Sequence, residues 1–426
     1  MHSKIYLSEH IDMKQLVIKN VGPIRQVHIK LNRFNFFIGP QSSGKSTVAK
    51  ILSSCMWLEK EVLTTLNDKV IADGAAFVRL VEGFHKIEGY FGDGSFVQYD
   101  TDFISILYNN KDIKITRKEN EDYHREKICY IPSERNIAAL PELQGFEFGH
   151  TNLRSFLFDW FNAREFFVAG NKTDVLNLGM KYFYDSEQSR QKDRIEQGDD
   201  QAYQIALSSA SSGLQSLTPL LVMLQYYTDE YFRSYNEKKS FATDTKFKNA
   251  VENLFSEFNK NKEKNNFKYE EQTNLAHEVG IKNFIEDLQT RLLNTKILST
   301  FSRLMVPHKT SFIIEEPEQN LYPSTQMDLL DLVVELCNGE KKHHCAITTH
   351  SPYILNKLNL LVKRFDVGVK GLAALNWDEL SVWAVKDGEV RDLKVRNAHL
   401  INPEYLSEPL DRIYQEYEQY ETATRE

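Results

Sequence analysis

The sequence predicts an α/β protein, because three apolar strands each lead directly into a helix. Residues 34–38 form an apolar run, interrupted only by Asn35, of the kind found in buried strands, and a helical pattern follows at 46–57. The same order recurs within 311–338, and again where a strand at 344–348 precedes a helix from Pro352. Strands that alternate with helices in this way are typical of the α/β class.

The composition limits the binding partners and the cellular compartment that can be expected for the protein. The 426 residues are 41% hydrophobic and carry a net charge of −8, which gives no argument for nucleic acid but leaves room for a local basic patch. The four cysteines are scattered without a CxxC pair, so neither a zinc ribbon nor a disulfide framework is indicated. The N-terminus is too polar for a signal peptide, and no apolar run approaches the roughly 20 residues of a membrane span. We therefore expect a cytoplasmic protein without a membrane partner.

A glycine-rich turn lies between the first buried strand and its helix. It reads GPQSSGKST and consists of Gly39, Pro40, Gln41, Ser42, Ser43, Gly44, Lys45, Ser46 and Thr47. This spacing fits the P-loop pattern, in which backbone N–H groups and a helix N-terminus surround phosphate oxygens. Lys45 would reach the β- and γ-phosphates, and the Ser46 hydroxyl would bind Mg²⁺. An ordinary glycine turn is the alternative, and the buried strand before it and Lys-Ser-Thr after it disfavour that interpretation.

Two acids end the second strand, in the stretch SFIIEEPEQNLYP. A carboxylate at the strand tip would hold the Mg²⁺ water shell, and the next would deprotonate the attacking water. This assigns Glu315 to the metal and Glu316 to the base. A pair of surface acids before a proline turn is the alternative, but it does not explain why both acids follow four mostly apolar residues.

Two weaker signals complete the pattern. His350 stands at the tip of the third strand, in AITTHSPYIL, where an imidazole could contact a γ-phosphate; alone, such a histidine would more often be structural. The stretch SSASSGLQSLTPLL begins a helix rich in serine and glycine, a second place for a phosphate, although by itself a plain helix cap is the better explanation. Its candidate residues are Ser211, Ser212, Gly213 and Gln215.

In this order, the four signals resemble an ABC-type ATPase head, and more narrowly the SMC/RecF group and the ATPase part of OLD nucleases. The opening LVIKNVGPIRQVHIKL and FNFFIGPQSSGKST are similar to the first strands and P-loop of that group. EEPEQNLYP resembles its Walker B segment and D-loop, and THSPYIL its switch histidine. The resemblance covers about residues 14–58, 205–224 and 310–360.

The resemblance implies a P-loop NTPase that binds ATP and Mg²⁺ and closes as a dimer, or a higher oligomer, around the nucleotide. The serine-rich turn of one subunit, with Ser211, Ser212, Gly213 and Gln215, would then contact ATP held by the other. Three departures are visible: the signature reads SSGLQ rather than LSGGQ, Glu315 stands where many heads have Asp, and the gap from 212 to 311 is long. We interpret that gap as an inserted helical arm.

Three regions are expected on this basis. Residues 1–150 would form an N-terminal ATPase lobe with the P-loop and antiparallel β decoration, 151–305 a helical region with the signature and the arm, and 306–426 a C-terminal lobe. Lysines within 259–272 either belong to a solvated surface or contact phosphate, and the run 185–201 is expected to be a helix surface or a loop. The turn 131–135 takes the place of the Q-loop, or else Arg135 makes a structural salt bridge.

OLD-type nucleases carry a C-terminal Toprim domain with clustered acids, and the residues after the switch histidine of this chain show no such cluster. We therefore expect that ATP hydrolysis controls an effector, a nuclease or toxin, that is a separate polypeptide. This arrangement resembles ATPase subunits of bacterial anti-phage systems such as PARIS and Septu. One alternative is a RecF- or SMC-like repair ATPase that clamps DNA. Another is a scaffold that binds ATP and hardly hydrolyses it.

Overall fold

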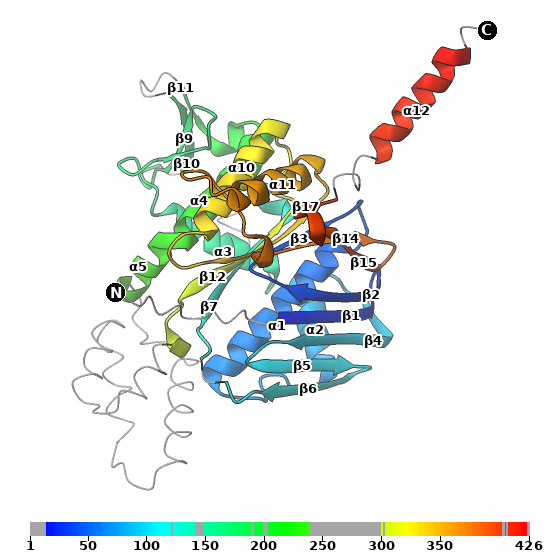
Figure 1. Ribbon diagram of the computed structural model, residues 1–426. Helices are drawn as coiled ribbons and strands as arrows, with labels where there is room; N and C mark the ends of the chain where they lie inside the picture. The colour runs from blue at the N-terminus through cyan, green and yellow to red at the C-terminus, as the bar shows by residue number, and fades with distance from the viewer. Residues whose placement is uncertain are drawn as a thin grey trace, which may run out of the picture.

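The computed structural model describes residues 14–120, 122–140, 149–188, 191–198, 203–238, 300, 303–402, 405 and 408–423 (Figure 1). An eleven-stranded sheet runs through this part of the chain in the order β6-β5-β4-β1-β2-β15-β14-β3-β13-β12-β7. Helices cover both faces of the sheet, so the α/β prediction is confirmed.

Five strands form the parallel part of this sheet. They are β3 (Phe34–Ile38), β7 (Glu126–Ile131), β12 (Lys309–Glu315), β13 (His344–Thr349) and β14 (Leu380–Lys386). β12 pairs with β7 and β13, and β3 pairs with β13 and β14, all in parallel. The carboxyl ends of these strands therefore meet at one edge, where ligand sites of such sheets are found.

The antiparallel lobe extends the sheet on one side. Its strands are β1 (Lys14–Val21), β2 (Ile24–Leu31), β4 (Phe91–Asp100), β5 (Ile104–Asn109) and β6 (Asp112–Arg117). β1 pairs with β2 and with β4, β4 pairs with β5, and β5 pairs with β6, all antiparallel. This confirms the antiparallel β structure expected near the N-terminus.

A hairpin joins the two parts of the sheet. β14 turns into β15 (Glu389–Asp392) through Asp387 and Gly388, whose φ angles are 52° and 77°. Positive φ at both turn residues is the type I′ geometry that matches strand twist, and Asp-Gly is favoured there.

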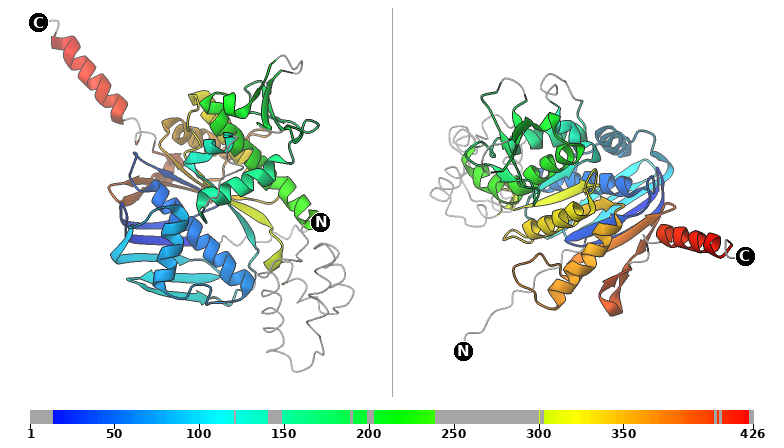
Figure 2. Two further views of the ribbon diagram at one scale, coloured as in Figure 1. Left: turned by 180° about the vertical axis from the view of Figure 1, so that it is seen from behind. Right: turned by 90° about the horizontal axis from the view of Figure 1, so that it is seen from above.

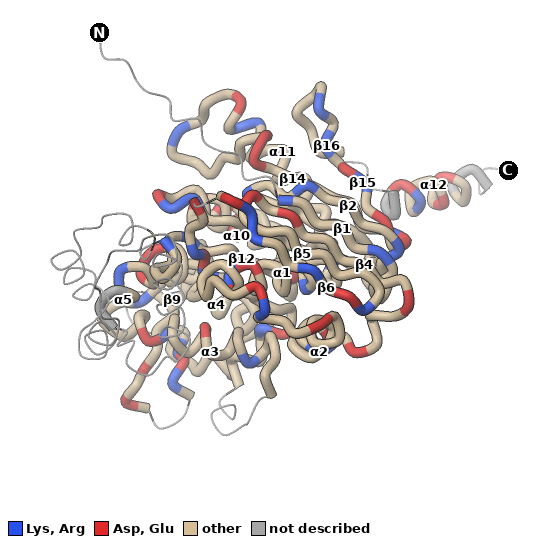
Figure 3. Tube along the Cα trace, turned by 90° about the horizontal axis from the view of Figure 1, so that it is seen from below, with Lys and Arg blue, Asp and Glu red and all other residues tan. Residues whose placement is uncertain are grey.

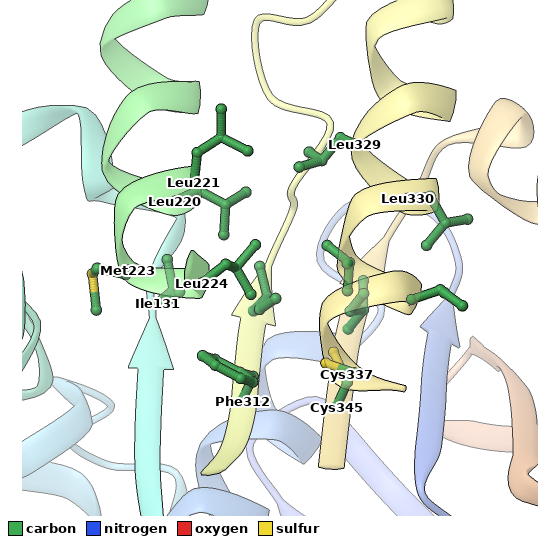
Figure 4. Close-up of a cluster of buried hydrophobic side chains, with 14 of the residues drawn as sticks. Ile131, Leu220, Leu221, Met223, Leu224, Phe312, Leu329, Leu330, Cys337 and Cys345 are labelled. Atoms are coloured by element: carbon green, nitrogen blue, oxygen red, sulfur yellow. The ribbon is translucent and has the colours of Figure 1, made fainter. Parts of the chain in front are cut away.

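Alternation along the central strands divides the core between two faces. Phe34, Phe36 and Ile38 pack with helices α3 (Asn152–Arg164), α4 (Ser212–Gln225), α10 (Pro323–Cys337) and α11 (Pro352–Asp366). Figure 4 shows this face, where leucines of α4 and α10 meet above Phe312 and Cys345. Phe37 points to the other face, which α1 (Lys45–Thr65) and α2 (Gly74–His85) cover.

A second sheet corrects the expectation for the middle of the chain. Residues 173–206, expected to be helix or loop, hold four antiparallel strands in the order β11-β10-β9-β8. The strands are β8 (Thr173–Asp174), β9 (Met180–Tyr184), β10 (Asp193–Gln197) and β11 (Tyr203–Ala206). They are only two to five residues long, which is too short for a clear alternation. The buried side chains of Tyr182 and Ile195 attach them to the main core.

The remaining elements are short or terminal. A π-helical turn η4 (Tyr226–Glu230) leads from α4 to α5 (Tyr231–Lys238), and most of the predicted arm, with its lysines at 260–268, lies outside the described residues. The 3₁₀ turns are η1 (Ser133–Ala139), η3 (Leu207–Ser209), η6 (Trp377–Glu379) and η7 (Arg396–Ala398). Two-residue strands β16 (Lys394–Val395) and β17 (Leu400–Ile401) precede the last helix, α12 (Glu408–Ala423). The boundaries at 150 and 305 stay a prediction.

Among the described residues, no helix combines the length and the apolar character that crossing a membrane requires.

Candidate functional site

The glycine-rich turn connects β3 to α1 at the carboxyl edge of the parallel strands. Gly44 caps α1 with φ at 103°, a conformation that favours glycine. Gly39 is fixed by space instead, since an added Cβ would lie 2.1 Å from the carbonyl oxygen of Val385. The amide of Gly39 donates to the carbonyl of Thr349 at 3.4 Å, which joins the turn to the end of β13.

Lys45 lies inside the turn rather than facing outward. The residue is only 4% exposed. Its ammonium donates to the carbonyls of Gly39 at 2.9 Å and Pro40 at 2.7 Å, because the loop curls over its own lysine. Burial lowers the pKa of Lys45, and the negative charges of the carboxylates of Glu316, Glu318 and Glu315 oppose that shift. Lys45 thus brings one positive charge close to three acids.

The other polar groups of the turn differ in their access. The hydroxyl of Ser43 is buried and has no hydrogen-bond partner among the described residues, whereas Ser46 is partly exposed and Thr47 is buried. A buried hydroxyl without a partner is rare, and a loop of this shape offers it to an anion. Gln41 and Ser42 are exposed at the loop tip.

Glu315 ends β12 with a buried carboxylate. Burial raises its pKa above the usual value, while Lys50 and a hydrogen bond from the phenol of Tyr130 lower it. No group of three His, Cys, Asp or Glu side chains that could hold a metal lies within the described residues. Mg²⁺ keeps several waters and takes only one or two protein oxygens beside phosphates, so Glu315 with the Ser46 hydroxyl fits such an ion.

Glu316 follows with a left-handed backbone, at φ 44°. Its amide donates to the carbonyl of Thr348 at 2.9 Å, so the chain turns sharply where β12 ends beside β13. Its carboxylate is partly exposed, and one oxygen lies 3.9 Å from Nδ1 of His350. A non-glycine residue with positive φ at a strand tip is uncommon and is found at functional sites.

Glu318 is a site residue that the sequence argument missed. Its buried carboxylate accepts the Thr349 hydroxyl at 2.7 Å and the backbone amide of His350 at 2.8 Å. The same oxygen lies 3.6 Å from Nδ1 of His350. Its signal in the sequence is the third acid of EEPE, which stands past the proline and not directly after the strand.

Arg135 is a residue whose role the sequence left open. Its guanidinium, 0% exposed, donates to the carbonyls of Ser216 at 3.0 Å, Glu315 at 2.8 Å and Glu316 at 2.8 Å. These contacts are to main-chain oxygens, and no ion pair of Arg135 is found in the described ranges, so the salt-bridge alternative is not supported there. Burial lowers the pKa of Arg135 to about 10. Arg135 therefore fastens α4 to the end of β12.

The serine-rich turn begins α4, as predicted. The Ser211 side chain caps the helix by accepting the amide of Leu214 at 3.4 Å, and Ser211 and Ser212 are exposed. Gly213 packs against its own chain, since a Cβ there would lie 2.9 Å from the Asn320 carbonyl. The Gln215 amide donates to the carbonyls of Ser208 and Ala210, both at 2.9 Å. A contact of this turn with nucleotide in another subunit stays a prediction.

No protein-family model matches the chain, and the comparison with curated proteins finds no significant match. Among solved structures, the chain is similar to the SMC head domain from Thermotoga maritima, at 9% identity and a TM-score of 0.36, over 89% of this chain and 97% of that one. An SMC head bound to the C-winged helix domain of ScpA is 12% identical, with a TM-score of 0.38, over 91% and 98%. The recombination mediator RecF with ATP is 10% identical, with a TM-score of 0.32, over 92% and 100%.

Proposed function

We propose that this protein is an ATPase that binds Mg²⁺ and ATP at the turn between β3 and α1. The observation that carries the proposal is the convergence of one buried lysine, one unpartnered hydroxyl and three acids at the edge of five parallel strands. Such an arrangement suits a triphosphate and a divalent cation, whose charges the lysine and the acids complement. ATP and Mg²⁺ together supply the phosphoryl group to be transferred and the charge that stabilises it.

Each residue then has a definite task. Lys45 exchanges its loop carbonyls for phosphate oxygens, and Ser46 and Glu315 hold the cation. Glu316 accepts the proton of a water molecule, and its partly exposed carboxylate leaves room for that water. His350 carries its imidazole beside Glu316, on the side of the site where the terminal phosphate would lie.

Two subunits complete the site in this proposal. Ser211 and Ser212 are exposed at the start of α4, where helix N–H groups favour an anion, and a second copy can present them to the nucleotide. Closure would bury ATP between two heads, and hydrolysis would separate them.

A mixing experiment tests this arrangement. Ser212→Arg blocks the serine-rich turn, Lys45→Ala removes the P-loop lysine, and each variant alone should hydrolyse little ATP. In a mixed dimer, the intact turn of the lysine variant meets the intact P-loop of the serine variant, so mixing should restore a substantial part of the activity. Ser186→Arg, at an exposed serine in the β9–β10 connection, is the matched control and should remain active. Absence of any gain on mixing would refute the shared site.

The biological use of this ATPase rests on the sequence resemblance. We propose that it controls a separate nuclease or toxin, as the sensor or scaffold subunit of an anti-phage system. Purification of the protein with the products of its own operon, followed by native mass measurement, tests this. A stoichiometric nuclease or toxin supports the proposal. ATP-dependent DNA binding without such a partner, with a steep dependence on salt, favours the DNA clamp instead.

A further inference from the structure

A cavity of about 430 Å³ lies at the edge of the main sheet, beside its last strand, β7. α1 and α2 cover one face of the sheet and α3 packs on the other, so helices flank the cavity on both sides of that edge (Figure 2). Its lining includes Trp57 of α1, Phe84 of α2, Ile128 of β7 and Phe158 of α3. The volume falls within the range of small-molecule sites, roughly 300–1,000 Å³. We call it the edge cavity.

The edge cavity is distinct from the glycine-rich turn. α1 begins at Lys45, whereas its residues that line the cavity start at Ser53, about 12 Å further along the helix at a rise of about 1.5 Å per residue. No residue of the turn is among the described residues of the lining. Tyr130 does line the cavity, and its phenol donates to Glu315, so one side chain connects it with the proposed cation site. A ligand in the edge cavity would be a second one, besides the nucleotide.

Two buried hydroxyl groups of the lining have no partner. Ser53 and Ser54 are 4% and 5% exposed, and neither side chain forms a hydrogen bond with any residue that the structure describes. Thr64 of the same helix donates to the carbonyl of Lys60 at 2.7 Å, a common solution for a hydroxyl inside a helix. Polar groups buried to this degree are rarely left unbonded. The two serines thus offer hydrogen bonds to a molecule in the cavity.

The charged side chains of the lining leave an excess of positive charge. They are four cations and two acids, and Figure 3 shows both signs on α1 and α3: Lys60, Arg125, Lys127, Arg154, Glu126 and Asp159. Both acids are already ion-paired. Asp159 lies 2.6 Å from the ammonium of Lys127, and Glu126 lies 3.4 Å from that of Lys309. The acids of the lining therefore do not balance its remaining cations.

The two arginines carry most of this excess. Lys60 lies 3.9 Å from the carboxylate of Glu61, so its charge is partly balanced. Arg125 donates to a phenol at 3.2 Å and to a main-chain carbonyl at 2.6 Å, both neutral. Arg154 forms no ion pair with a described residue, and its guanidinium lies 5.3 Å from the centre of the Phe158 ring. An anion in the cavity would meet these guanidinium groups, whose planar forks match phosphate oxygens.

Aromatic rings supply much of the apolar wall. Phe84 and His150, both in the lining, have ring centres 5.7 Å apart, and Phe158 is 55% exposed. Flat rings of a ligand stack on side chains of this kind. Rings and guanidinium groups together favour a ligand that is both aromatic and anionic.

We propose that the edge cavity binds a small molecule in which a flat aromatic ring is joined to a phosphate group, the chemistry of a nucleoside monophosphate. The phosphate would bind Arg154, and the ring would pack against Phe84 and Phe158. Ser53 and Ser54 would bind the remaining polar atoms. The volume suits one such molecule rather than a strand of nucleic acid. The site needs no ATP at the glycine-rich turn, so it is independent of the function proposed above.

Calorimetry on the full chain with Lys45→Ala tests this site apart from the glycine-rich turn. Adenosine monophosphate and cytidine monophosphate are the probes, and at least one should bind at one site per chain. Adenosine alone and inorganic phosphate alone should bind at least about tenfold more weakly, because each keeps only part of the contacts. Absence of binding by both monophosphates at millimolar concentration would refute the proposal, as would equal affinity for adenosine. Tighter binding of a single-stranded oligonucleotide with a 5′-phosphate would also overturn it, in favour of a nucleic-acid end.

Replacement of one arginine locates the phosphate. Arg154→Ala, added to the same chain, should weaken binding of the probe by at least about tenfold. Arg79→Ala, at an exposed arginine of α2 outside the described lining, is the matched control and should bind the probe normally. Thermal unfolding without ligand checks that both variants are folded. Unchanged affinity in Arg154→Ala would contradict the proposal.

Trp57 reports the position of the ring without the loss of a charge. An aromatic ligand beside its indole should change the tryptophan fluorescence on binding. Trp57→Phe keeps a ring in the wall, so the probe should still bind, but most of the fluorescence change should disappear. Trp383→Phe, at a tryptophan outside the described lining, is the control and should retain it. A change of equal size in Trp57→Phe would place the ligand elsewhere.

Discussion

The carboxylate of Glu318 accepts the backbone amide of His350 at 2.8 Å, and the same oxygen lies 3.6 Å from the imidazole Nδ1 of that residue. With the hydroxyl of Thr349 also donating to it, this buried acid fixes the end of β13. The histidine proposed to lie beside the terminal phosphate is thus oriented by a residue three positions beyond Glu315.

Replacement of Glu318 should show how far the orientation of His350 matters for ATP hydrolysis. Glu318→Ala leaves two buried donors without an acceptor, so we expect a loss of about 1–3 kcal/mol in stability and at least a tenfold loss of hydrolysis. Glu318→Gln keeps an acceptor oxygen and should retain most of the stability. Thermal unfolding and phosphate release measure the two effects. Full activity of the alanine variant would show that Glu318 does not position His350.

Tyr130 should tune the cation site through Glu315. Its phenol donates to the Glu315 carboxylate, and this bond lowers a pKa that burial raises. Tyr130→Phe should therefore raise that pKa further, so that the ionised form is lost at a higher pH as the solution becomes more acidic. We expect several-fold more Mg²⁺ for half-maximal hydrolysis and an acidic limb shifted upward. Tyr108→Phe, at another buried tyrosine, is the control. An unchanged Mg²⁺ requirement would exclude this role.

Arg135 should contribute strongly to stability. Loss of its guanidinium removes the hydrogen bonds that it donates to the carbonyls of Ser216, Glu315 and Glu316. Arg135→Ala should lower the free energy of unfolding by more than about 3 kcal/mol. Arg233→Ala removes only an exposed ion pair with Asp229 and should change it by less than about 0.5 kcal/mol. Equal effects of the two variants, measured by urea unfolding, would contradict the structural role of Arg135.

We expect the stability of the protein to depend on pH through His85. It is buried, neither ring nitrogen has a hydrogen-bond partner in the described structure, and burial lowers its pKa to about 3. The unfolded chain binds a proton below about pH 6.5, so stability contributed by neutral His85 falls as the pH drops from there toward 3. His85→Phe should remove a destabilisation of about 2 kcal/mol at pH 5 and none above pH 7.5. Urea midpoints at the two pH values measure it; equal gains would exclude titration as the cause.

Local patterns explain why the central site could be predicted. The glycine-rich turn occupies nine consecutive residues, and Glu315, Glu316 and His350 follow directly on buried strands, so spacing alone marks them as candidates. The contacts of Glu318 and Arg135 could not be predicted, because their partners are distant in the sequence. Arg135 reaches Ser216 and Glu316 across 81 and 181 positions. Only the folded sheet brings these groups together.

The secondary structure, too, could be predicted only in part. Buried strands such as Phe34–Ile38 were predicted, because complete burial leaves a mostly apolar run. The strands within 173–206 were not, because a segment such as Asp193–Gln197 contains one apolar residue and is stabilised by pairing on both sides. Cross-strand contacts of that kind leave no period in the sequence.

Removal of Lys45 should abolish nucleotide binding without unfolding the protein. Lys45→Ala leaves the carbonyls of Gly39 and Pro40 accessible to water and removes the only lysine found inside the described turn. Calorimetry should detect no ATP binding, while thermal unfolding changes little. Lys114→Ala, at an exposed lysine of β6, should bind ATP normally. Retained affinity in the Lys45 variant would place the nucleotide elsewhere.

The most direct test of the account compares binding and hydrolysis in Glu316→Gln. The change removes the proposed base but leaves the turn, Lys45 and Glu315 in place. We predict that ATP binding measured by calorimetry stays within about threefold of the wild type, while phosphate release falls by at least about a hundredfold. Phosphate release at the wild-type rate, or a wild type that neither binds nor hydrolyses ATP, would contradict the proposed function.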